Sequence, residues 1–142
     1  MRMSPGTVDK PGLPDMGELL VQDFDPARIE GYHAHVYYRS PAERAHAAVI
    51  REAAEHRFDL VMGRWRDKPV GPHPVAMYQM AFAAALFAEF VPWLQSVRGP
   101  LSILVHTRTG LSDRLDHSVG AMWLGPSLEL KLDFFDRDGK SA

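Results

Sequence analysis

The spacing of apolar residues divides the chain into alternating strands and helices. Residues 31–38 read GYHAHVYY, and this run of aromatic and β-branched side chains is typical of a strand. Ser40 and Pro41 then supply an N-cap and a first-turn proline. Alanines at helical spacing predict a helix over residues 42–56. The pattern therefore opens with a strand followed by a helix.

The middle of the chain continues this alternation. We expect strands at residues 58–66, 75–82 and 101–106, and a second helix at residues 83–97. Pro92 can kink that helix or start a new one. Three prolines forbid regular structure in the loop 67–74. After a polar stretch at 107–119, apolar residues at 122–124 and 128–134 indicate one or two short strands.

This order of elements is β-α-β-β-α-β with a C-terminal strand extension. It predicts an α+β protein with a ferredoxin-like sandwich, in which both helices cover one face of an antiparallel sheet. The first and third strands are then central, and the fourth lies beside the first. The other face needs a cover, which could be the C-terminal segment, a second subunit or a ligand. Leu104 and Met77 would lie on that apolar face, so we expect a homodimer.

Length and termini indicate one domain. The chain has 142 residues. Prolines and glycines dominate its start, so we expect a flexible tail at 1–28, a single domain at 29–135 and a C-terminal tail at 136–142. The N-terminus lacks a hydrophobic signal core, and no apolar run approaches the roughly 20 residues that span a bilayer. We therefore expect a cytoplasmic protein with no membrane partner.

Composition narrows the possible chemistry. The absence of cysteine excludes disulfides, thiolate metal sites and a cysteine nucleophile. The 16 basic residues are outnumbered by 18 acidic ones, so no basic excess favours nucleic-acid binding. The seven histidines are the unusual feature.

Three histidines fall at strand positions that face one way. Side chains alternate along a strand, so His33 and His35 share one face. The intervening residues are apolar and suit the helix-covered side. His106 has the corresponding place on the fourth strand, which is the predicted neighbour of the first. The Cα atoms of His33 and His35 should lie about 6.6 Å apart, within reach of one ion at about 2.1 Å from each nitrogen. Solvated or hydrogen-bonded histidines are the alternative.

Four more histidines lie outside these strands. His73 sits between two prolines in a loop that could hold an acid or a base in place, or could be a surface turn. His117 follows Asp116 and could be a metal ligand, a proton-transfer group or part of a polar loop. His46 and His56 fall in the first helix, where we expect solvated or helix-end side chains.

Several separated motifs also carry a family resemblance. They are YHAHVYY at 32–38, VGPHP at 70–74, GPLSILVH at 99–106, TG at 109–110, DH at 116–117 and WLG at 123–125. In this order they resemble the DOPA 4,5-dioxygenase family over about residues 29–132. The resemblance implies a ferredoxin-like, usually dimeric protein. It also implies a non-haem iron extradiol dioxygenase that opens a catechol ring with O₂.

On that resemblance, we expect Fe(II) as cofactor, with zinc or another divalent ion able to replace it during purification. The expected ligands are His33, His35 and His106, and His73 and His117 are candidates for proton transfer to and from the catechol. DOPA or a related catechol is the expected substrate, together with O₂. Candidate substrate contacts are Tyr37, Gln79, Arg108 and Trp123.

Some alternatives stay open. The predicted open faces of the three best strands carry no carboxylate, so the centre is all-histidine, or Asp116 or Glu129 supplies an oxygen. His117 could also replace one of the three ligands. Arg66 and Arg108 could pair with an acidic substituent or be ordinary surface charges. From another class, the chain could be a non-catalytic ferredoxin-like dimer that binds a small aromatic ligand or a partner protein, or a zinc hydrolase using the same ligands.

Overall fold

The computed structural model describes residues 24–136. Of the tails expected at 1–28 and 136–142, residues 1–23 and 137–142 lie outside the described residues. The first described element is the short 3₁₀ helix η3 (Pro26–Arg28), in which the Asp25 carboxylate accepts a hydrogen bond from the Ala27 amide. A capped turn therefore falls within the segment expected as an N-terminal tail.

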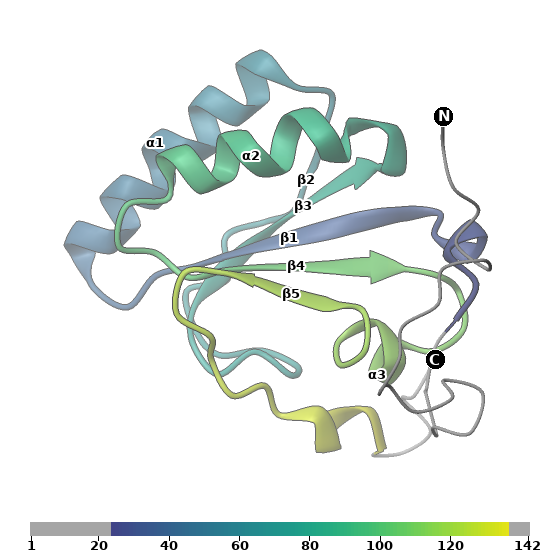
Figure 1. Ribbon diagram of the computed structural model, residues 1–142. Coiled ribbons are helices and arrows are strands. Elements are labelled where there is room, and N and C mark those ends of the chain that lie inside the picture. The colour runs from purple at the N-terminus through teal and green to yellow at the C-terminus, as the bar shows by residue number, and fades with distance from the viewer. Residues whose placement is uncertain (1–23, 137–142) are drawn as a thin grey trace, which may run out of the picture.

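A single antiparallel sheet forms the centre of the molecule (Figure 1). Its strands are β1 (Gly31–Tyr37), β2 (Val61–Met62), β3 (Met77–Ala83), β4 (Ile103–Arg108) and β5 (Ala121–Leu124). They lie in the order β2-β3-β1-β4-β5, with β1 between β3 and β4. This order confirms the ferredoxin-like arrangement, and β5 is the C-terminal extension at the edge next to β4.

Two helices cover one face of this sheet, as Figure 1 shows. They are α1 (Pro41–Arg57) and α2 (Phe87–Val97). The Ser40 hydroxyl accepts from the Glu43 amide and begins α1, as the sequence predicts. Pro92 lies within α2 without ending it. The core between helices and sheet includes Ala34, Val36, Ala47, Ile50, Ala54, Tyr78, Met80, Phe82, Phe90, Leu94, Ile103 and Val105.

The second predicted strand is much shorter than expected. Only β2 pairs in the ladder, and the chain then touches β3 again where Arg66 bridges Met77. Gly63 lies between these points and donates its amide to the Gln79 carbonyl. A Cβ at Gly63 would lie 3.2 Å from that carbonyl oxygen, so a side chain at this position would crowd β3.

Three other boundaries differ from the prediction. The second helix starts later than residue 83, because β3 runs to Ala83 and the 3₁₀ helix η4 (Ala84–Leu86) intervenes. The polar stretch 107–119 contains one helical turn, α3 (Asp113–Asp116). The segment 128–134 forms no strand and runs into the 3₁₀ helix η5 (Leu132–Asp136), because its apolar residues pack onto the sheet face instead of pairing at an edge.

The C-terminal segment covers part of the open sheet face. Tyr37, Met77 and Leu104 form a second buried cluster, against which Leu128 and Leu130 pack. The face that was expected to favour a homodimer is therefore filled by the chain itself over these residues. The dimer expectation then depends on the family resemblance alone. None of the helices between residues 24 and 136 is long and apolar enough to cross a membrane.

Candidate metal centre

Five histidines surround a cavity of about 400 Å³ on the sheet face away from α1 and α2. We call it the histidine cavity. It is lined by His33, His35, His73, His106 and His117, with Gln79, Arg108, Glu30, Leu111, Asp113, Asp116 and Phe135 among the other walls. Strands β1 and β4 supply the floor, while α3 and the loop before β3 supply the sides. Figure 1 shows α3 on the opposite side of the sheet from α1 and α2.

The three strand histidines come together as their spacing predicts. His33 lies directly opposite His106 in the β1–β4 ladder, and His35 follows on the same face. The ring centroids of His33 and His106 are 5.1 Å apart, and those of His35 and His106 are 5.0 Å apart. One nitrogen from each ring lies within 4.8 Å of the others, so these rings could hold one metal ion.

The protonation pattern of His35 and His106 fits a metal. Nδ1 of His106 lies 2.9 Å from the Thr107 carbonyl, which can only accept, so Nδ1 carries the proton and Nε2 a lone pair. That Nε2 lies 3.0 Å from Nε2 of His35. Two nitrogens bound at right angles to one ion, each at about 2.1 Å, lie about 3.0 Å apart. The spacing therefore suits two ligands of one divalent ion.

His35 also has an incomplete set of hydrogen bonds. It is only 2% exposed, and its Nδ1 has no hydrogen-bond partner among the described residues. Buried polar atoms in proteins almost always have a partner, so this nitrogen is available to a bound ion or a water molecule. His35 also approaches His73, with ring centroids 4.3 Å apart.

His73 and His117 approach the same centre from two loops. With His35 they form a second group whose nitrogens lie within 4.8 Å of one another. Nδ1 of His117 donates to the Asp113 carbonyl at 2.7 Å, which leaves Nε2 with a lone pair. The His117 ring is 4.0 Å from that of His106. His117 is therefore near enough to act either as a ligand or in proton transfer, and the two alternatives from the sequence remain.

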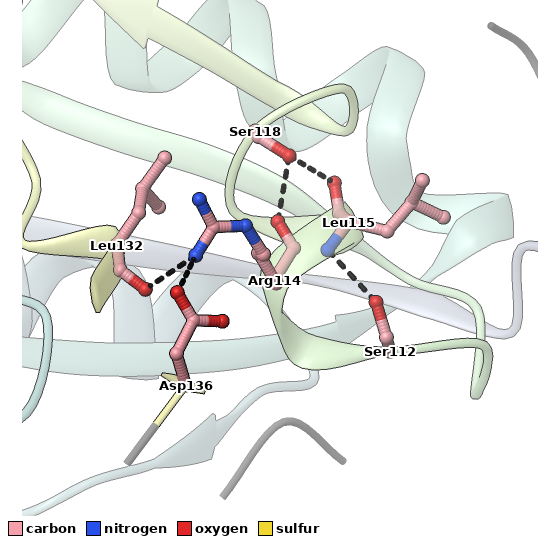
Figure 2. A network of polar contacts seen from close by, with 6 residues as sticks. All are labelled: Ser112, Arg114, Leu115, Ser118, Leu132 and Asp136. Atoms are coloured by element: carbon pink, nitrogen blue, oxygen red, sulfur yellow. Dashed lines mark hydrogen bonds and ion pairs between the residues drawn. The ribbon is translucent and has the colours of Figure 1, made fainter. Parts of the chain in front are cut away.

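A polar network holds the single turn that carries His117 (Figure 2). The Ser112 hydroxyl accepts from the Leu115 amide at 3.0 Å and caps α3. The Ser118 hydroxyl donates to the Arg114 carbonyl. The Arg114 guanidinium donates to the Leu132 carbonyl at 3.0 Å and forms an ion pair with Asp136 at 2.6 Å. These contacts fix α3 to the C-terminal 3₁₀ helix η5 and so fix the cavity wall.

Tyr37 and Trp123 lie behind the cavity instead of lining it. The Tyr37 hydroxyl is hydrogen-bonded to Nδ1 of His73 at 2.8 Å, and Trp123 stacks on the Tyr37 ring with centroids 5.7 Å apart. Burial raises the pKa of Tyr37 well above its usual value, so the phenol stays protonated. Tyr37 contacts His73, and Trp123 stacks on Tyr37, while the contact of these two side chains with substrate stays a prediction.

Burial lowers the pKa of all five cavity histidines. The value falls to about 4 for His33, about 3 for His73 and about 2 for His106. The pKa of His35 lies well below the usual value and that of His117 is also lowered. Loss of hydration is the largest cause for each ring, and neighbouring positive charge adds to it for His33, His35, His73 and His106. The rings are therefore neutral at neutral pH, as metal ligands must be.

The two carboxylates that the sequence offered as metal ligands, Asp116 and Glu129, are engaged elsewhere or exposed. Asp116 is buried, and its Oδ1 accepts from the hydroxyls of Thr107 at 2.8 Å and Thr109 at 2.9 Å. Its Oδ2 accepts from the Thr109 amide at 3.2 Å. Glu129 is exposed and does not line the cavity. Among the described residues, an all-imidazole ligand set is therefore the arrangement that the geometry favours.

Gln79 and Arg108 do line the cavity, as the sequence suggests. Gln79 lies opposite His35 in the β1–β3 ladder, and Arg108 is exposed at the end of β4. Sequence reasoning missed Phe135, whose ring lies 4.8 Å from that of His117. No spacing links residue 135 to the strands, so only the folded C-terminal segment shows this contact.

The histidines of α1 take no part in the cavity. His46 is not a solvated side chain, since its Nε2 is hydrogen-bonded to the Val97 carbonyl at 2.8 Å and ties α1 to the end of α2. His56 is exposed in the last turn of α1, as expected.

Fold and site together define a small α+β protein with a buried imidazole cluster suited to a divalent metal. A model of the Dopa 4,5-dioxygenase family matches residues 32–134, and the chain belongs to that family. A protein from Amanita muscaria named DOPA 4,5-dioxygenase is 34% identical over 123 residues, which cover 81% of this chain and 54% of that protein. The chain thus spans about half the length of this relative.

Two further relatives agree with this assignment. An uncharacterised 21.2 kDa protein from Botryotinia fuckeliana is 32% identical over 130 residues, covering 84% of this chain and 71% of that protein. A crystal structure from Nostoc punctiforme, described as a candidate dioxygenase, is 46% identical with a TM-score of 0.77. The matched region covers 81% of this chain and 98% of the Nostoc punctiforme chain.

Proposed function

We propose that this protein is a non-haem Fe(II)-dependent extradiol dioxygenase that cleaves the ring of DOPA or a related catechol with O₂. The observation that carries the proposal is the set of ring nitrogens on His33, His35 and His106, mutually within 4.8 Å beside a cavity of about 400 Å³. Membership of a dioxygenase family supports the same class of reaction.

His33, His35 and His106 would hold the iron, because two strands fix their positions. When bound, the iron would supply open positions for the two catechol oxygens and O₂, together with the redox chemistry of ring opening. Neutral imidazoles add no negative charge, so they leave the attraction of the site for a catecholate undiminished.

His73 and His117 would move the catechol protons. Both rings are neutral at neutral pH, as a proton acceptor must be. Tyr37 holds Nδ1 of His73, and the Asp113 carbonyl holds Nδ1 of His117, so each ring is fixed through one nitrogen and has the other left for substrate. Gln79 and Arg108 would contact the substrate from the cavity wall, and Phe135 supplies an apolar surface for its ring.

The test is reconstitution of the protein with Fe(II) without oxygen, followed by DOPA and a panel of other catechols in oxygenated buffer. We expect stoichiometric iron by elemental analysis, oxygen uptake and a yellow ring-opened semialdehyde. An iron-loaded protein that gives no ring-opened product from any catechol would contradict the proposal.

Single substitutions test the ligands. His33→Ala and His106→Ala should each lose bound iron, whereas His56→Gln, a histidine change on the exposed side of α1, should retain it. Intact iron content in both alanine variants would reject this ligand assignment.

A further inference from the structure

A second cavity adjoins the histidine cavity. Its volume is about 250 Å³, and it shares two wall residues, His73 and Gln79, with the histidine cavity. We call it the arginine cavity, because its charged walls are Arg64 and Arg66. None of the described residues that line it is acidic. A molecule in the histidine cavity therefore has a positively charged space beside it.

The sheet register and the lining of the cavity place both arginines on the histidine face. Arg66 bridges Met77 of β3, so residues 63–66 continue along the sheet beside that strand. Trp65, between the two arginines, packs into the core under the helices. Met77 belongs to the buried cluster on the histidine face, so Arg66 lies on that face, and both arginines line the arginine cavity together with Gln79 and His73.

The charges of these arginines are not neutralised within residues 24–136. Asp67 is the acid next to Arg66 in the chain, but it forms an ion pair with Arg44 at 2.9 Å and accepts the Tyr38 hydroxyl at 2.7 Å. Neither Arg64 nor Arg66 forms an ion pair with another described residue. Two guanidinium groups that line one cavity without an ion-pair partner among the described residues attract an anion.

The distance suits a substituted catechol. Residue 63 is two strands away from His35, across Gln79, and two strand spacings amount to about 10 Å. A catechol ring with a short carboxylic acid chain has a comparable length. The planar guanidinium group matches a carboxylate with two parallel hydrogen bonds.

We propose that Arg64 and Arg66 form an anion subsite for the carboxylate of the catechol side chain. The substrate class is then a catechol whose substituent carries net negative charge. An ammonium group on that substituent would find no acidic partner in the arginine cavity. This inference rests on the proposed ring-cleaving function and adds the charge of the preferred substrate.

Catechol binding measured without oxygen distinguishes a failure of the proposed function from a failure of the anion subsite. The Fe(II)-loaded protein is titrated anaerobically by calorimetry with 3-(3,4-dihydroxyphenyl)propionate, its uncharged amide, DOPA and dopamine. All four share the catechol, so differences in Kd report the substituent. We expect the propionate to bind most tightly and dopamine most weakly, with the propionate preference reduced by salt. If no catechol binds, the proposed function fails; if all four bind equally, only the subsite fails.

Variants assign the effect to these residues. Arg64→Gln and Arg66→Gln should each weaken propionate binding about two- to fivefold, the range for exposed ion pairs, and the double variant about tenfold. Amide binding should not change. Arg39→Gln removes the same charge at an exposed position outside both cavities and should have no effect.

A charge-reversing substitution and steady-state kinetics test the anion subsite independently of the binding measurements. Arg66→Glu should favour dopamine over the propionate. In steady-state assays of the double variant, KM for the propionate should rise while kcat stays near normal. Unchanged Kd in a folded double variant, checked by circular dichroism, would overturn the subsite.

Discussion

Single hydrogen bonds decide which nitrogens of the cluster face the cavity. The Thr107 carbonyl fixes Nδ1 of His106, the Asp113 carbonyl fixes Nδ1 of His117, and the Tyr37 hydroxyl contacts Nδ1 of His73. Each bond helps to set the orientation of its ring, as partners of metal-binding and catalytic histidines commonly do. Substitutions of the residues around the histidines can therefore test the site while the histidines themselves stay unchanged.

Removal of the Tyr37 hydroxyl should reduce turnover without unfolding the protein. Tyr37→Phe keeps the buried ring that stacks on Trp123 but frees His73. We expect kcat to fall about tenfold or more, with a shifted pH–rate profile, and iron content to stay normal. Steady-state kinetics over a pH range measures this.

Tyr78→Phe is the matched control. Its hydroxyl donates to the Ala47 carbonyl on the helix side of the sheet, so the variant should lose about 1 kcal/mol of stability and keep its pH profile. Equal profiles in the two variants would show that Tyr37 is only a packing residue.

The buried Asp116 carboxylate should be a stability residue. It accepts three hydrogen bonds from Thr107 and Thr109, so Asp116→Ala leaves buried donors without an acceptor. We expect a loss of about 1–3 kcal/mol in the free energy of unfolding, measured with urea. Asp59→Asn, at an exposed position, should change it little. Normal stability of Asp116→Ala would contradict this role.

At the scale of elements, the site combines strands of the central sheet with short segments that the sheet does not hold. His33, His35 and His106 lie on paired strands, whereas His117 follows a helix of one turn whose support comes from side chains (Figure 2). An isolated turn of helix is not stable by itself, so its cap matters more than that of a long helix. Two serine caps allow this difference to be tested.

Ser112→Ala should lower activity more than stability. The substitution removes the bond to the Leu115 amide and loosens α3, so we expect kcat to fall several-fold, with a stability loss of about 1 kcal/mol. Ser40→Ala removes the same kind of cap from α1 and should cost similar stability with unchanged kcat. The experiment combines thermal melts with oxygen uptake. An equal loss of activity in both variants would contradict the assigned role of α3.

At the scale of the whole molecule, the neutral histidine cluster makes the metal-free fold sensitive to acid. In the unfolded chain these histidines take up protons below about pH 6.5, whereas in the folded chain His33 does so only near 4 and His73 only near 3. The unfolded state therefore binds more protons in this window. Stability should fall as pH decreases from about 6.5 towards 4.

Urea unfolding of the metal-free protein at a series of pH values measures this slope. His33→Asn should make the slope shallower, because one ring with a lowered pKa no longer titrates. A stability that does not vary between pH 6.5 and 4 would show that the rings are protonated in the folded state.

The sequence alone determined the fold and three of the histidine positions. Alternation along residues 31–37 and 103–106 places His33, His35 and His106 on one face, because side chains of a strand alternate whatever surrounds them. The order of strands and helices then selects the sheet topology, since few arrangements bury both helices. The alternation of side chains along a strand is a local property of the backbone, so the order of residues in the sequence can reveal it.

Only the tertiary structure decided what surrounds those histidines. It turned Tyr37 towards His73, placed Phe135 against His117 and set Arg64 beside the cavity. It also packed the C-terminal segment on the apolar face, for which the sequence had left open this segment, a second subunit or a ligand. Loops and chain termini have no regular repeat of side-chain positions from which the path of the chain can be predicted. Their places follow from packing against residues far away in the chain, and no local pattern contains that information.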